Sequence, residues 1–412
     1  MKILLVHNKY QVRGGEDSVV ENETKMLRDH GHEVIEYIRD NSEINIVKGI
    51  GKLLIPFKSI YNTSAYCDVK KILLCEHVDI VHIHNTHMVI SPSVIYAARK
   101  CKVPVVMTLH NFRLLCAGAM LYRGGHICED CVGGCLWKGV KYGCFRNSKI
   151  QSLAIVLSDY FHRLTGIYKY VNFICLSEFN KEKLLTLKQV CVDKVFVKPN
   201  FGVKPDLELN IENTVTNNSD LEMINNDVIE NEQSELQDRD IYLYFGRMDE
   251  TKGVKLIIDA FSEMPDKKLA MAGNGPLLEE CQKMVADKGL RNIEILGWCD
   301  KEKLTELFSR TKAVICASQW YEGHPMVVVE SFANGIPVIT GDLGNIGTTV
   351  TDGYNGIKYK YDSKDALRDA VVLFEANDRT ELSENAKKTF EDKYTEEMNY
   401  KLLIDIYDSI IN

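Results

Sequence analysis

The stretch from Ala313 to Thr340, AVICASQWYEGHPMVVVESFANGIPVIT, contains two short apolar runs with a helical pattern between them. We expect the first run to form a buried strand, followed by a loop, a helix that begins after the Gly-His-Pro turn, and a second buried strand. Continuous apolar strands joined by helices indicate a parallel sheet that is covered on both faces. Two glutamates, Glu322 and Glu330, lie on either side of the turn, and the rest of the chain has to identify what they bind.

Apolar runs of this kind recur along the chain in two series. The first half contains KILLVHN, EVIEYI, DIVHIHN, VPVVMTLHN and FICLS, and the second half contains IYLYFGR, KKLAMAGNG, IEILGW, AVICAS and IPVITGD. Amphipathic stretches such as DSVVENETKMLRDHG separate some of them. β-Branched runs that alternate with helical patterns are typical of doubly wound sheets. The predicted fold class is therefore α/β, with two Rossmann-like doubly wound parallel-sheet domains.

A change in composition between the two series suggests the domain limits. Residues 205–240 are acidic, rich in Asn, Ser and Glu and nearly devoid of aromatic residues, which is typical of a solvated surface insertion. We expect an N-terminal domain over residues 1–200 with a Cys-rich insertion at 116–144, an acidic mobile insertion or linker over 201–240, and a C-terminal domain over 241–395. The last segment, 396–412, has helical spacing and is expected to pack back on the N-terminal domain.

Composition and charge narrow the functional classes. The chain has 412 residues, of which 45% are hydrophobic and 26% charged, as in ordinary soluble globular proteins. A net charge of -8 argues against general nucleic-acid binding. The first apolar run is too short for a signal peptide, and no apolar stretch approaches the roughly 18 residues that would span a membrane. We therefore expect a cytoplasmic protein whose 13 cysteines are mostly free thiols or metal ligands.

Two glycine-containing loops are candidates for anion binding. After the run IYLYF come Gly246, Arg247 and Lys252, at the carboxyl end of a predicted strand, where open α/β sheets bind ligands. The Arg fork and the Lys point charge suit a diphosphate, although two solvated loop cations would look the same. Gly14 and Gly15 follow the first strand and could let backbone N–H groups approach a phosphate or hydroxyl. An ordinary strand-to-helix turn is the alternative for this pair.

The turn at residues 323–325 is predicted to expose a helix N-terminus. It would leave backbone N–H groups free to receive phosphate or sugar oxygens, namely those of Met326, Val327 and Val328. Glu330 lies about one turn further along, where it could accept hydrogen bonds from a ribose, and Glu322 could bind sugar hydroxyls. A solvated helix residue is the alternative for Glu330. The surrounding run MVVVESFA is otherwise apolar, however, and a buried carboxylate needs a partner.

Several motifs together resemble one known family. The segment EGHPMVVVE resembles the E-x7-E element of the retaining glycosyltransferases with the GT-B fold, glycosyltransferase family 4. FGRMDETKG resembles their donor-phosphate loop, and VKPNFGV resembles their segment near the hinge. DIVHIHNTHMVISPSVIYAARKCKVPVVMTLHNFRLLC resembles their acceptor-domain region. The similarity covers nearly the whole chain apart from the acidic insertion.

The resemblance implies a nucleotide-diphosphate sugar bound in a cleft between the domains. It implies that Arg247 and Lys252 neutralise the diphosphate, that Glu330 binds the ribose, that Glu322 contacts the donor sugar and that His110 lies at this sugar near the acceptor. Further donor-binding positions are implied at Gly14, Gly15, Gly246, Gly323, His324, Pro325, Met326, Val327 and Val328. The chain departs from the usual family form in His324, where Phe is usual, and in NFGV in place of NGV.

The implied reaction moves a sugar to a glycan or a lipid-linked saccharide, with retention of the anomeric configuration, in bacterial surface polysaccharide synthesis. No metal is required for this chemistry, because fixed cations and helix N-termini can stabilise the leaving diphosphate. The two glutamates would then be binding groups rather than the acid/base pair of a glycosidase. A nucleotide-sugar epimerase on the same fold is one alternative. A non-catalytic scaffold organised around a zinc module is another.

Five of the 13 cysteines fall within residues 116–144. Cys128 and Cys131 have the spacing of a metal knuckle, and Cys116 and Cys144 flank them. Cys135 and His126 are spare ligands. A structural zinc could hold this Gly-rich segment, and a set of free thiols in a small subdomain is the alternative.

The segment from Ile46 to Tyr66 carries Lys48, Lys52 and Lys58 and no acidic residue among many apolar ones. LWKGVKYGCFRNSK has the same character. In an acidic protein, such a local reversal of charge suggests contact with an anionic bilayer, which would place the chain peripherally on the inner face of the cell membrane. An amphipathic helix packed on the N-terminal sheet is an equally good interpretation of the first segment.

Overall fold

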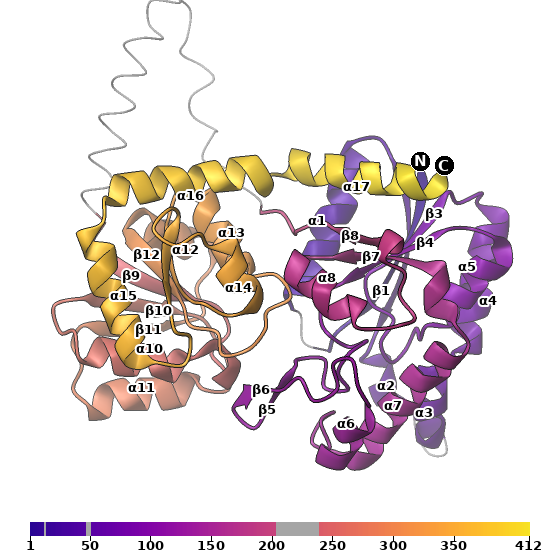
Figure 1. Ribbon diagram of the computed structural model, residues 1–412, viewed down its shortest axis with the longest axis horizontal. Helices are drawn as coiled ribbons and strands as arrows, with labels where there is room; N and C mark the ends of the chain where they lie inside the picture. Colours follow the sequence, from indigo (N-terminus) through magenta and orange to yellow (C-terminus); the bar gives the residue numbers. More distant parts are fainter. Residues whose placement is uncertain (12–13, 47–50, 203–238) are drawn as a thin grey trace, which may run out of the picture. The chain divides into compact units, whose positions relative to one another are not determined.

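The computed structural model describes residues 1–11, 14–46, 51–202 and 239–412, without the side chains of 46 and 51–54 (Figure 1). The chain forms two compact units, one made of residues 1–200 and 396–412 and the other of residues 201–395. Apart from its ends, the acidic insertion expected over 201–240 lies outside the described residues, as does Lys48.

The N-terminal unit contains a parallel six-stranded sheet with the order β2-β1-β3-β4-β7-β8. Its strands are β1 (Lys2–Lys9), β2 (Glu33–Asp40), β3 (Ile80–Ile83), β4 (Val105–Leu109), β7 (Val171–Cys175) and β8 (Val195–Val197). The first five match the apolar runs of the first half of the sequence. The short strand β8 was not expected, because three residues between polar neighbours give no periodic signal.

Helices connect these strands, and one more comes from the end of the chain. They are α1 (Gly15–Asp29), α2 (Glu43–Ile46), α3 (Gly51–Ile60), α4 (Thr63–Cys75), α5 (Ser93–Cys101), α6 (Trp137–Tyr142), α7 (Lys149–Leu164), α8 (Glu178–Leu185) and α17 (Glu396–Ile411). Between β4 and α7 the chain makes a small antiparallel hairpin of β5 (Tyr122–Arg123) and β6 (His126–Ile127).

The C-terminal unit contains a second parallel six-stranded sheet, with the order β11-β10-β9-β12-β13-β14. Its strands are β9 (Ile241–Phe245), β10 (Lys268–Ala272), β11 (Ile293–Gly297), β12 (Thr311–Cys316), β13 (Val338–Gly341) and β14 (Gly356–Tyr359). Its helices are α10 (Val254–Ser262), α11 (Leu278–Asp287), α12 (Lys301–Ser309), α13 (Met326–Ala333), α14 (Gly344–Thr349), α15 (Lys364–Ala376) and α16 (Arg379–Lys393). The two doubly wound parallel sheets confirm the predicted fold class.

Strand β9 shows why its sequence is apolar throughout. Ile241, Leu243 and Phe245 belong to one buried cluster of this unit, whereas Tyr242 and Tyr244 belong to another. Successive side chains of a strand point to opposite faces of the sheet, so both faces of this strand are covered. A strand buried on both faces has no polar alternation, which is what the run IYLYF indicates.

The strand order fixes where each unit can bind a ligand. In the N-terminal sheet β1 lies between β2 and β3, and in the C-terminal sheet β9 lies between β10 and β12. The connections therefore reverse direction at these strands, and the loops that follow them diverge to leave a crevice at their carboxyl ends. Gly246 follows β9 directly, and His84 follows β3. Among the described helices, none has the length and apolarity needed to cross a membrane.

Candidate functional site

The loop after β9 presents the two predicted cations of the C-terminal unit. Arg247 is exposed, and its Nε atom lies 3.3 Å from Oδ2 of Asp249. Lys252 ends a short turn and is followed by Gly253 at φ +66°, where an added Cβ would lie 2.1 Å from the carbonyl oxygen of Ala317. Only glycine permits this approach, so Gly253 sets the loop against the end of β12.

Lys252 and Glu322, which are seventy residues apart in sequence, form an ion pair. The Nζ atom of Lys252 lies 2.5 Å from Oε1 of Glu322. The same carboxylate oxygen accepts hydrogen bonds from Oγ of Ser318 at 2.6 Å and from Nε1 of Trp320 at 3.3 Å. Burial disfavours the charged ammonium, but the carboxylate of Glu322 outweighs this effect and raises the pKa of Lys252. Glu322 therefore holds a charged lysine at the end of β12.

The turn at 323–325 leads into α13, which begins at Met326 as expected. Asn345 from α14 donates hydrogen bonds to the carbonyl oxygens of Glu322, at 3.2 Å, and of Gly323. The turn also lies close to the β9 loop, because a Cβ added to Gly246 would be 3.9 Å from Cγ2 of Val327. The structure therefore brings Gly246, the turn and the Lys252–Glu322 pair into one place.

The expectation that the N–H groups of Met326, Val327 and Val328 are all free is wrong for two of them. The N–H of Met326 donates to the carbonyl oxygen of His324 at 3.0 Å, and the N–H of Val328 donates to that of Pro325 at 2.9 Å. The non-helical backbone of Pro325, which caps the helix, turns these carbonyl groups over the first turn. The helix N-terminus is thus partly closed by its own turn.

Glu330 and His324 complete the predicted donor residues of this unit. Glu330 is half-buried, and burial raises its pKa to about 7. A carboxyl group in this setting gains from hydroxyl donors, which would satisfy its oxygens. The ring of His324 packs edge-on against Tyr394, with ring centroids 5.7 Å apart. His324 thus makes an aromatic contact within its own unit at the position where the family usually has Phe.

His110 lies at the end of β4 in the N-terminal unit and forms a histidine pair. Its Nε2 atom lies 3.0 Å from Nδ1 of His84, and the two rings stack with centroids 5.3 Å apart. Burial, together with the neighbouring histidine, holds the pKa of His110 well below its usual range. Burial likewise lowers the pKa of His84 to about 3. Both rings are therefore neutral at physiological pH.

A buried carboxylate supports the histidine pair from behind. Oε1 of Glu23, on α1, lies 3.2 Å from Nε2 of His84 and 3.1 Å from Nδ1 of His82. Oε2 of Glu23 accepts from the ammonium of Lys198 at 3.0 Å, and both side chains are 1% exposed. Burial raises the pKa of Glu23, but Lys198 and the two histidines outweigh it and hold this pKa well below its usual range.

The last helix of the chain closes this network. Asn399 on α17 accepts from Nζ of Lys198 at 2.7 Å, and the hydroxyl of Tyr407 lies 2.7 Å from Nδ1 of His82. Within the described part of the chain, Glu23, His82 and His84 are the one set of three metal-binding side chains whose ligand atoms lie within 4.8 Å of one another. The ammonium of Lys198 already neutralises Glu23, so we interpret the set as a charge network rather than a metal site.

We infer from its neighbours which nitrogen of His110 carries the proton. Nε2 of His84 faces the carboxylate of Glu23 at 3.2 Å, and a proton on this nitrogen leaves Nδ1 of His84 to accept. His110 must then donate from Nε2, which leaves the lone pair of its Nδ1 available to a ligand. Sequence reasoning placed His110 at the site but missed Glu23, because a glutamate in an amphipathic helical pattern is usually solvated.

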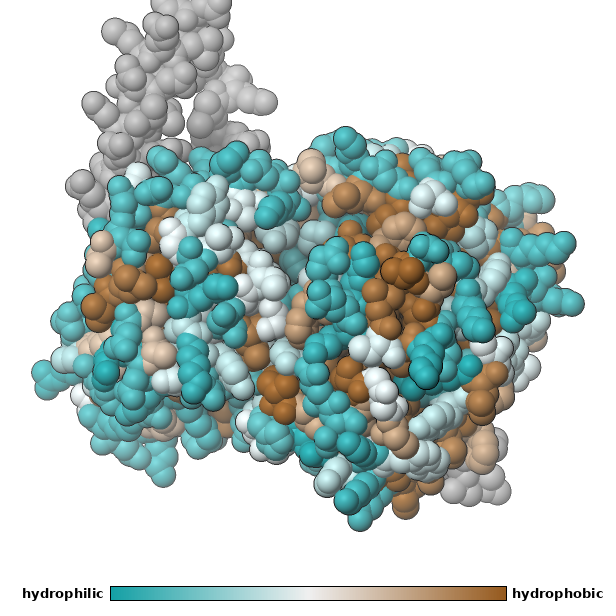
Figure 2. All heavy atoms as spheres, in the orientation of Figure 1, coloured by the Kyte–Doolittle hydropathy of each residue, from teal (hydrophilic) through white to brown (hydrophobic). Residues whose placement is uncertain are grey.

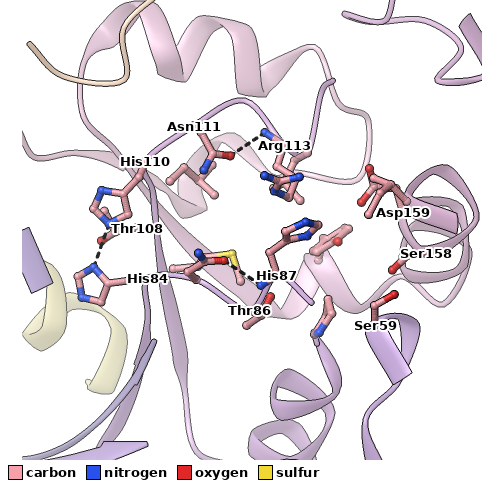
Figure 3. A pocket seen from close by; sticks show the side chains of 17 residues that line it. Ser59, His84, Thr86, His87, Thr108, His110, Asn111, Arg113, Ser158 and Asp159 are labelled. Atoms are coloured by element: carbon pink, nitrogen blue, oxygen red, sulfur yellow. Dashed lines mark hydrogen bonds between the residues drawn. The ribbon is translucent and has the colours of Figure 1, made fainter. Parts of the chain in front are cut away.

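His110 also lines a pocket of the N-terminal unit, whose walls come from the end of β4, from the residues that follow β3 and β4, and from α7. Figure 3 shows His84 and His110 on one side, Ser59, Ser158 and Asp159 on the other, and His87 and Arg113 between them. Four buried atoms of the lining residues have no hydrogen-bond partner among the described residues: Nε2 of His84, Nε2 of His87, Nη1 of Arg113 and Oδ2 of Asp159. Such atoms favour a ligand that can both donate and accept hydrogen bonds.

Burial shifts the pKa values of two side chains that line this pocket, Asp159 and His87. Burial raises the pKa of Asp159 to about 7, although Arg163 and Arg113 oppose the change. Burial and the charge of Arg113 hold the pKa of His87 well below its usual range. Sequence reasoning missed these residues. The available signal was Asp159 itself, which is the only acidic residue in the helical run KIQSLAIVLSDYFHRL.

Gly14 and Gly15 lie at the start of α1, with Gly14 as the N-cap residue. The N–H of Gly14 donates to Oδ2 of Asp17 at 2.9 Å, so this amide is already used. A Cβ added at either glycine would meet no atom within 4 Å among the described residues, and the space beside them is open. Nearby, burial raises the pKa of Glu16 to about 8, and the hydroxyl of Tyr10 donates to its Oε2 at 3.1 Å.

Comparison with known proteins gives a consistent classification. The family described as Glycosyltransferase Family 4 matches residues 13–202, and the family described as Glycosyl transferases group 1 matches residues 226–389. An uncharacterized glycosyltransferase of Methanocaldococcus jannaschii is 25% identical over 100% of this chain and 99% of its own length. A GDP-mannose-dependent phosphatidylinositol monomannoside mannosyltransferase of Mycolicibacterium smegmatis is 31% identical over 33% of this chain and 38% of its length.

Solved structures agree on the fold. A glycosyltransferase from Rickettsia africae has a TM-score of 0.67 at 18% identity and covers 100% of this chain and 98% of its own. The sucrose-phosphate synthase of Thermosynechococcus elongatus has a TM-score of 0.64 at 16% identity, over 99% and 98% of the two chains. The Anabaena protein HepE, in complex with UDP, has a TM-score of 0.62 at 15% identity, over 99% and 100%. With the two family matches and the two doubly wound sheets, the chain belongs to the GT-B glycosyltransferases of glycosyltransferase family 4.

Proposed function

We propose that this glycosyltransferase moves a sugar from a nucleotide-diphosphate sugar to a saccharide acceptor, with retention of the anomeric configuration. The observation that carries the proposal is the Lys252–Glu322 ion pair beside Gly246 and the start of α13, at the crevice that the order of the C-terminal sheet predicts. A partly buried pair of this kind serves a diphosphate well, because the lysine is largely desolvated and held in position.

We assign the donor to the C-terminal unit. Arg247, which is exposed, and Lys252 take the diphosphate and stabilise the negative charge that develops as the sugar leaves. Glu330 accepts hydrogen bonds from the ribose hydroxyls, which its half-buried carboxyl group favours. Glu322 contacts the donor sugar while it holds Lys252. The two glutamates bind and position, and neither serves as the acid or base of a double displacement.

We assign the acceptor to the pocket of the N-terminal unit. Asp159 and Arg113 offer an acceptor and a donor to saccharide hydroxyls, and each has an unsatisfied buried atom. His110 is neutral and presents the lone pair of Nδ1, so it accepts a hydrogen bond from a sugar hydroxyl. Glu23 and His84 act through His110 and are positioning residues.

The N-terminal unit favours a lipid-linked acceptor at an anionic membrane surface. Exposed apolar side chains lie at Ile150, Leu157, Phe161 and Leu164, a spacing that places them on one stripe of α7. Phe57 on α3 and Trp137 on α6 are also exposed. Figure 2 shows brown hydrophobic side chains along the edge of this unit where Figure 1 places α3, α6 and α7.

Helix α7 connects this surface to the pocket. Its outer stripe is apolar and lacks acidic residues, whereas Ser158 and Asp159 on the same helix line the pocket. Lys58, Lys141 and Lys149 are exposed on the neighbouring helices and on α7 itself. An apolar stripe flanked by lysines suits the interface of an anionic bilayer. Liposome co-sedimentation tests this part, because Leu164→Asp should lower binding to anionic vesicles, and equal binding of both proteins would contradict it.

Incubation of the full chain with nucleotide sugars and saccharide acceptors tests the reaction itself. We expect release of a nucleoside diphosphate that depends on the acceptor, and a product anomer that matches the donor by NMR. An inverted anomer would overturn the retaining assignment. An epimerase would instead convert the nucleotide sugar without any acceptor, so a control without acceptor separates the two reactions.

A further inference from the structure

The chain between β4 and α7 brings four distant cysteines to one place. Cys116, Cys128, Cys131 and Cys144 line one small pocket beside the β5–β6 hairpin. They come from three separate turns of the segment, and all 13 cysteines of the chain are free thiols. Cys135, which lies in the same segment, is exposed, and its Sγ lies 3.5 Å from the hydroxyl of Tyr160.

Close backbone packing maintains this arrangement. A Cβ on Gly118 would lie 3.1 Å from the carbonyl oxygen of Cys144, and a Cβ on Gly139 would lie 2.7 Å from Cβ of Ala117. The turn after Cys116 therefore packs directly on the turn that ends with Cys144. The β5–β6 hairpin positions the start of the C-x2-C pair, Cys128 and Cys131. The N–H of Cys128 donates to the carbonyl oxygen of Leu121 at 2.8 Å.

Two cations lie beside the four thiols. Arg123 and Lys138 line the same pocket, and both pair with Asp130, at 3.1 Å and 3.6 Å. Arg123 also lies over the ring of Tyr142, 3.7 Å from its centroid. Four thiolates around a divalent cation carry a net charge of about -2, and neighbouring cations stabilise such a site.

We propose that Cys116, Cys128, Cys131 and Cys144 bind one zinc ion in a tetrahedral tetrathiolate site. The thiols release their protons to solvent as the thiolates bind, and no bond to carbon changes. Among the described residues, no three of these sulfur atoms all lie within 4.8 Å of one another, so the proposed site requires the cysteine side chains to adopt other rotamers. Four cysteines that include a C-x2-C pair have the ligand set of a structural zinc site.

The zinc ligands Cys116 and Cys144 adjoin two segments that line the N-terminal pocket. Cys116 follows the residues after β4, of which Asn111 and Arg113 line that pocket, and Cys144 precedes α7, which supplies Asp159. A zinc ion that joins the two cysteines would fix both of these walls. This consequence rests on the proposed acceptor role of the pocket, whereas the metal site itself does not.

Metal content is the direct test. We expect the full chain, purified without chelator, to hold about one zinc per chain by mass spectrometry, and each of Cys116→Ser, Cys128→Ser, Cys131→Ser and Cys144→Ser to lose it. Cys135→Ser is the matched control from the same segment and should keep the zinc. Wild type without zinc, or equal loss in Cys135→Ser, would overturn the proposal. So would a disulfide between any two of the four cysteines, found in the non-reduced protein by peptide mapping.

A cobalt titration covers the case in which the variants fail to fold. Wild-type protein stripped of zinc should bind Co²⁺ with the strong sulfur-to-metal absorption and the visible bands of a tetrahedral thiolate complex. An octahedral, weakly absorbing spectrum would contradict the assignment. In the same stripped protein, nucleotide-sugar binding should persist while transfer to the acceptor falls. If the zinc-loaded wild-type protein binds zinc but no nucleotide sugar, the proposed function is contradicted and the metal site is not.

Discussion

Nδ1 of His84 lies 3.0 Å from Nε2 of His110, and Glu23 lies on the far side of His84 with Oε1 3.2 Å from Nε2. From the order carboxylate, histidine, histidine we infer that Nε2 of His110 donates to Nδ1 of His84, which leaves the lone pair of His110 on its Nδ1. Lys198, Asn399 and Tyr407 surround the carboxylate side of this order. The final helix of the chain thus helps to orient a residue that lies at the end of β4.

Removal of Glu23 should therefore affect both stability and transfer. Glu23→Leu leaves the ammonium of Lys198 buried and unpaired, which should lower the free energy of unfolding by about 3–5 kcal/mol. Adding Lys198→Met should restore much of this loss, because both charges are then absent. Transfer should stay low in the double variant, since His84 still lacks its acceptor. Denaturant unfolding and kcat measure the two effects, and a fully active double variant would contradict the positioning role.

Lys252 should dominate donor affinity. Lys252→Ala removes a desolvated cation and leaves Glu322 without its charge partner, so donor affinity should fall by about 10- to 100-fold. Lys255→Ala is the control, because Lys255 is two residues beyond Gly253 and pairs with Glu280 at 2.8 Å instead. Isothermal titration with the donor or its nucleoside diphosphate measures the effect. Equal affinities for the two variants would show that the ion pair has no part in donor binding.

Glu330 should make donor binding depend on pH near neutrality. Its pKa in the folded protein is about 7, so part of the population is protonated at pH 7. Ribose hydroxyls donate to the ionised form, so donor affinity should rise as pH increases through 7 and level off above it. Glu330→Gln should remove this pH dependence and bind more weakly at pH 8. A wild-type affinity that stays constant between pH 6 and 8 would rule out the assignment.

The same group should affect folding stability in the opposite direction. The pKa of Glu330 is raised from 4.5 to about 7 on folding, so the folded state binds the proton more tightly than the unfolded state. Stability from this group is fully present below pH 4.5 and is lost as pH rises through 7, by about 3 kcal/mol at most. Glu330→Gln should abolish this loss, so the variant should be more stable than wild type at pH 8 by thermal unfolding.

Asp159 should govern the acceptor rather than the donor. Asp159→Asn removes an acceptor oxygen from the pocket and also a buried group that is costly to ionise. We expect KM for the acceptor to rise by about 10-fold or more, KM for the donor to stay constant, and the melting temperature to stay equal or increase. Asp193→Asn, at an exposed position of the same unit, is the control. A rise in KM for the donor alone would contradict the placement of the acceptor.

The fold and the donor residues could be predicted because their signals are local. An apolar run such as IYLYF reports burial on both faces, and Gly246, Lys252, Glu322 and Glu330 stand in motifs of recognisable spacing. The strands β8 and β14 were missed, because three or four residues carry too little periodicity. The expected free N–H groups of α13 depended on the backbone of Pro325, which no spacing reveals.

The support of His110 was missed for a different reason. Glu23 is separated from His84 by about sixty residues, and it meets this histidine because α1 packs on β1, the strand beside β3. Lys198, which follows β8, donates to the same carboxylate, and Asn399 of the last helix accepts from Lys198 in turn. Such contacts between distant segments depend on the topology of the fold. A helical sequence pattern alone does not distinguish a buried glutamate from a solvated one.

Donor binding is the most direct test of the central claim. A thermal-shift screen of the full chain over nucleoside diphosphates and nucleotide sugars should find at least one nucleotide sugar that raises the melting temperature, because a ligand of the folded state alone stabilises it. The shift at a fixed ligand concentration should be smaller in Lys252→Ala and unchanged in Lys255→Ala. A chain that no nucleotide sugar or nucleoside diphosphate stabilises, or an undiminished shift in Lys252→Ala, would contradict the account.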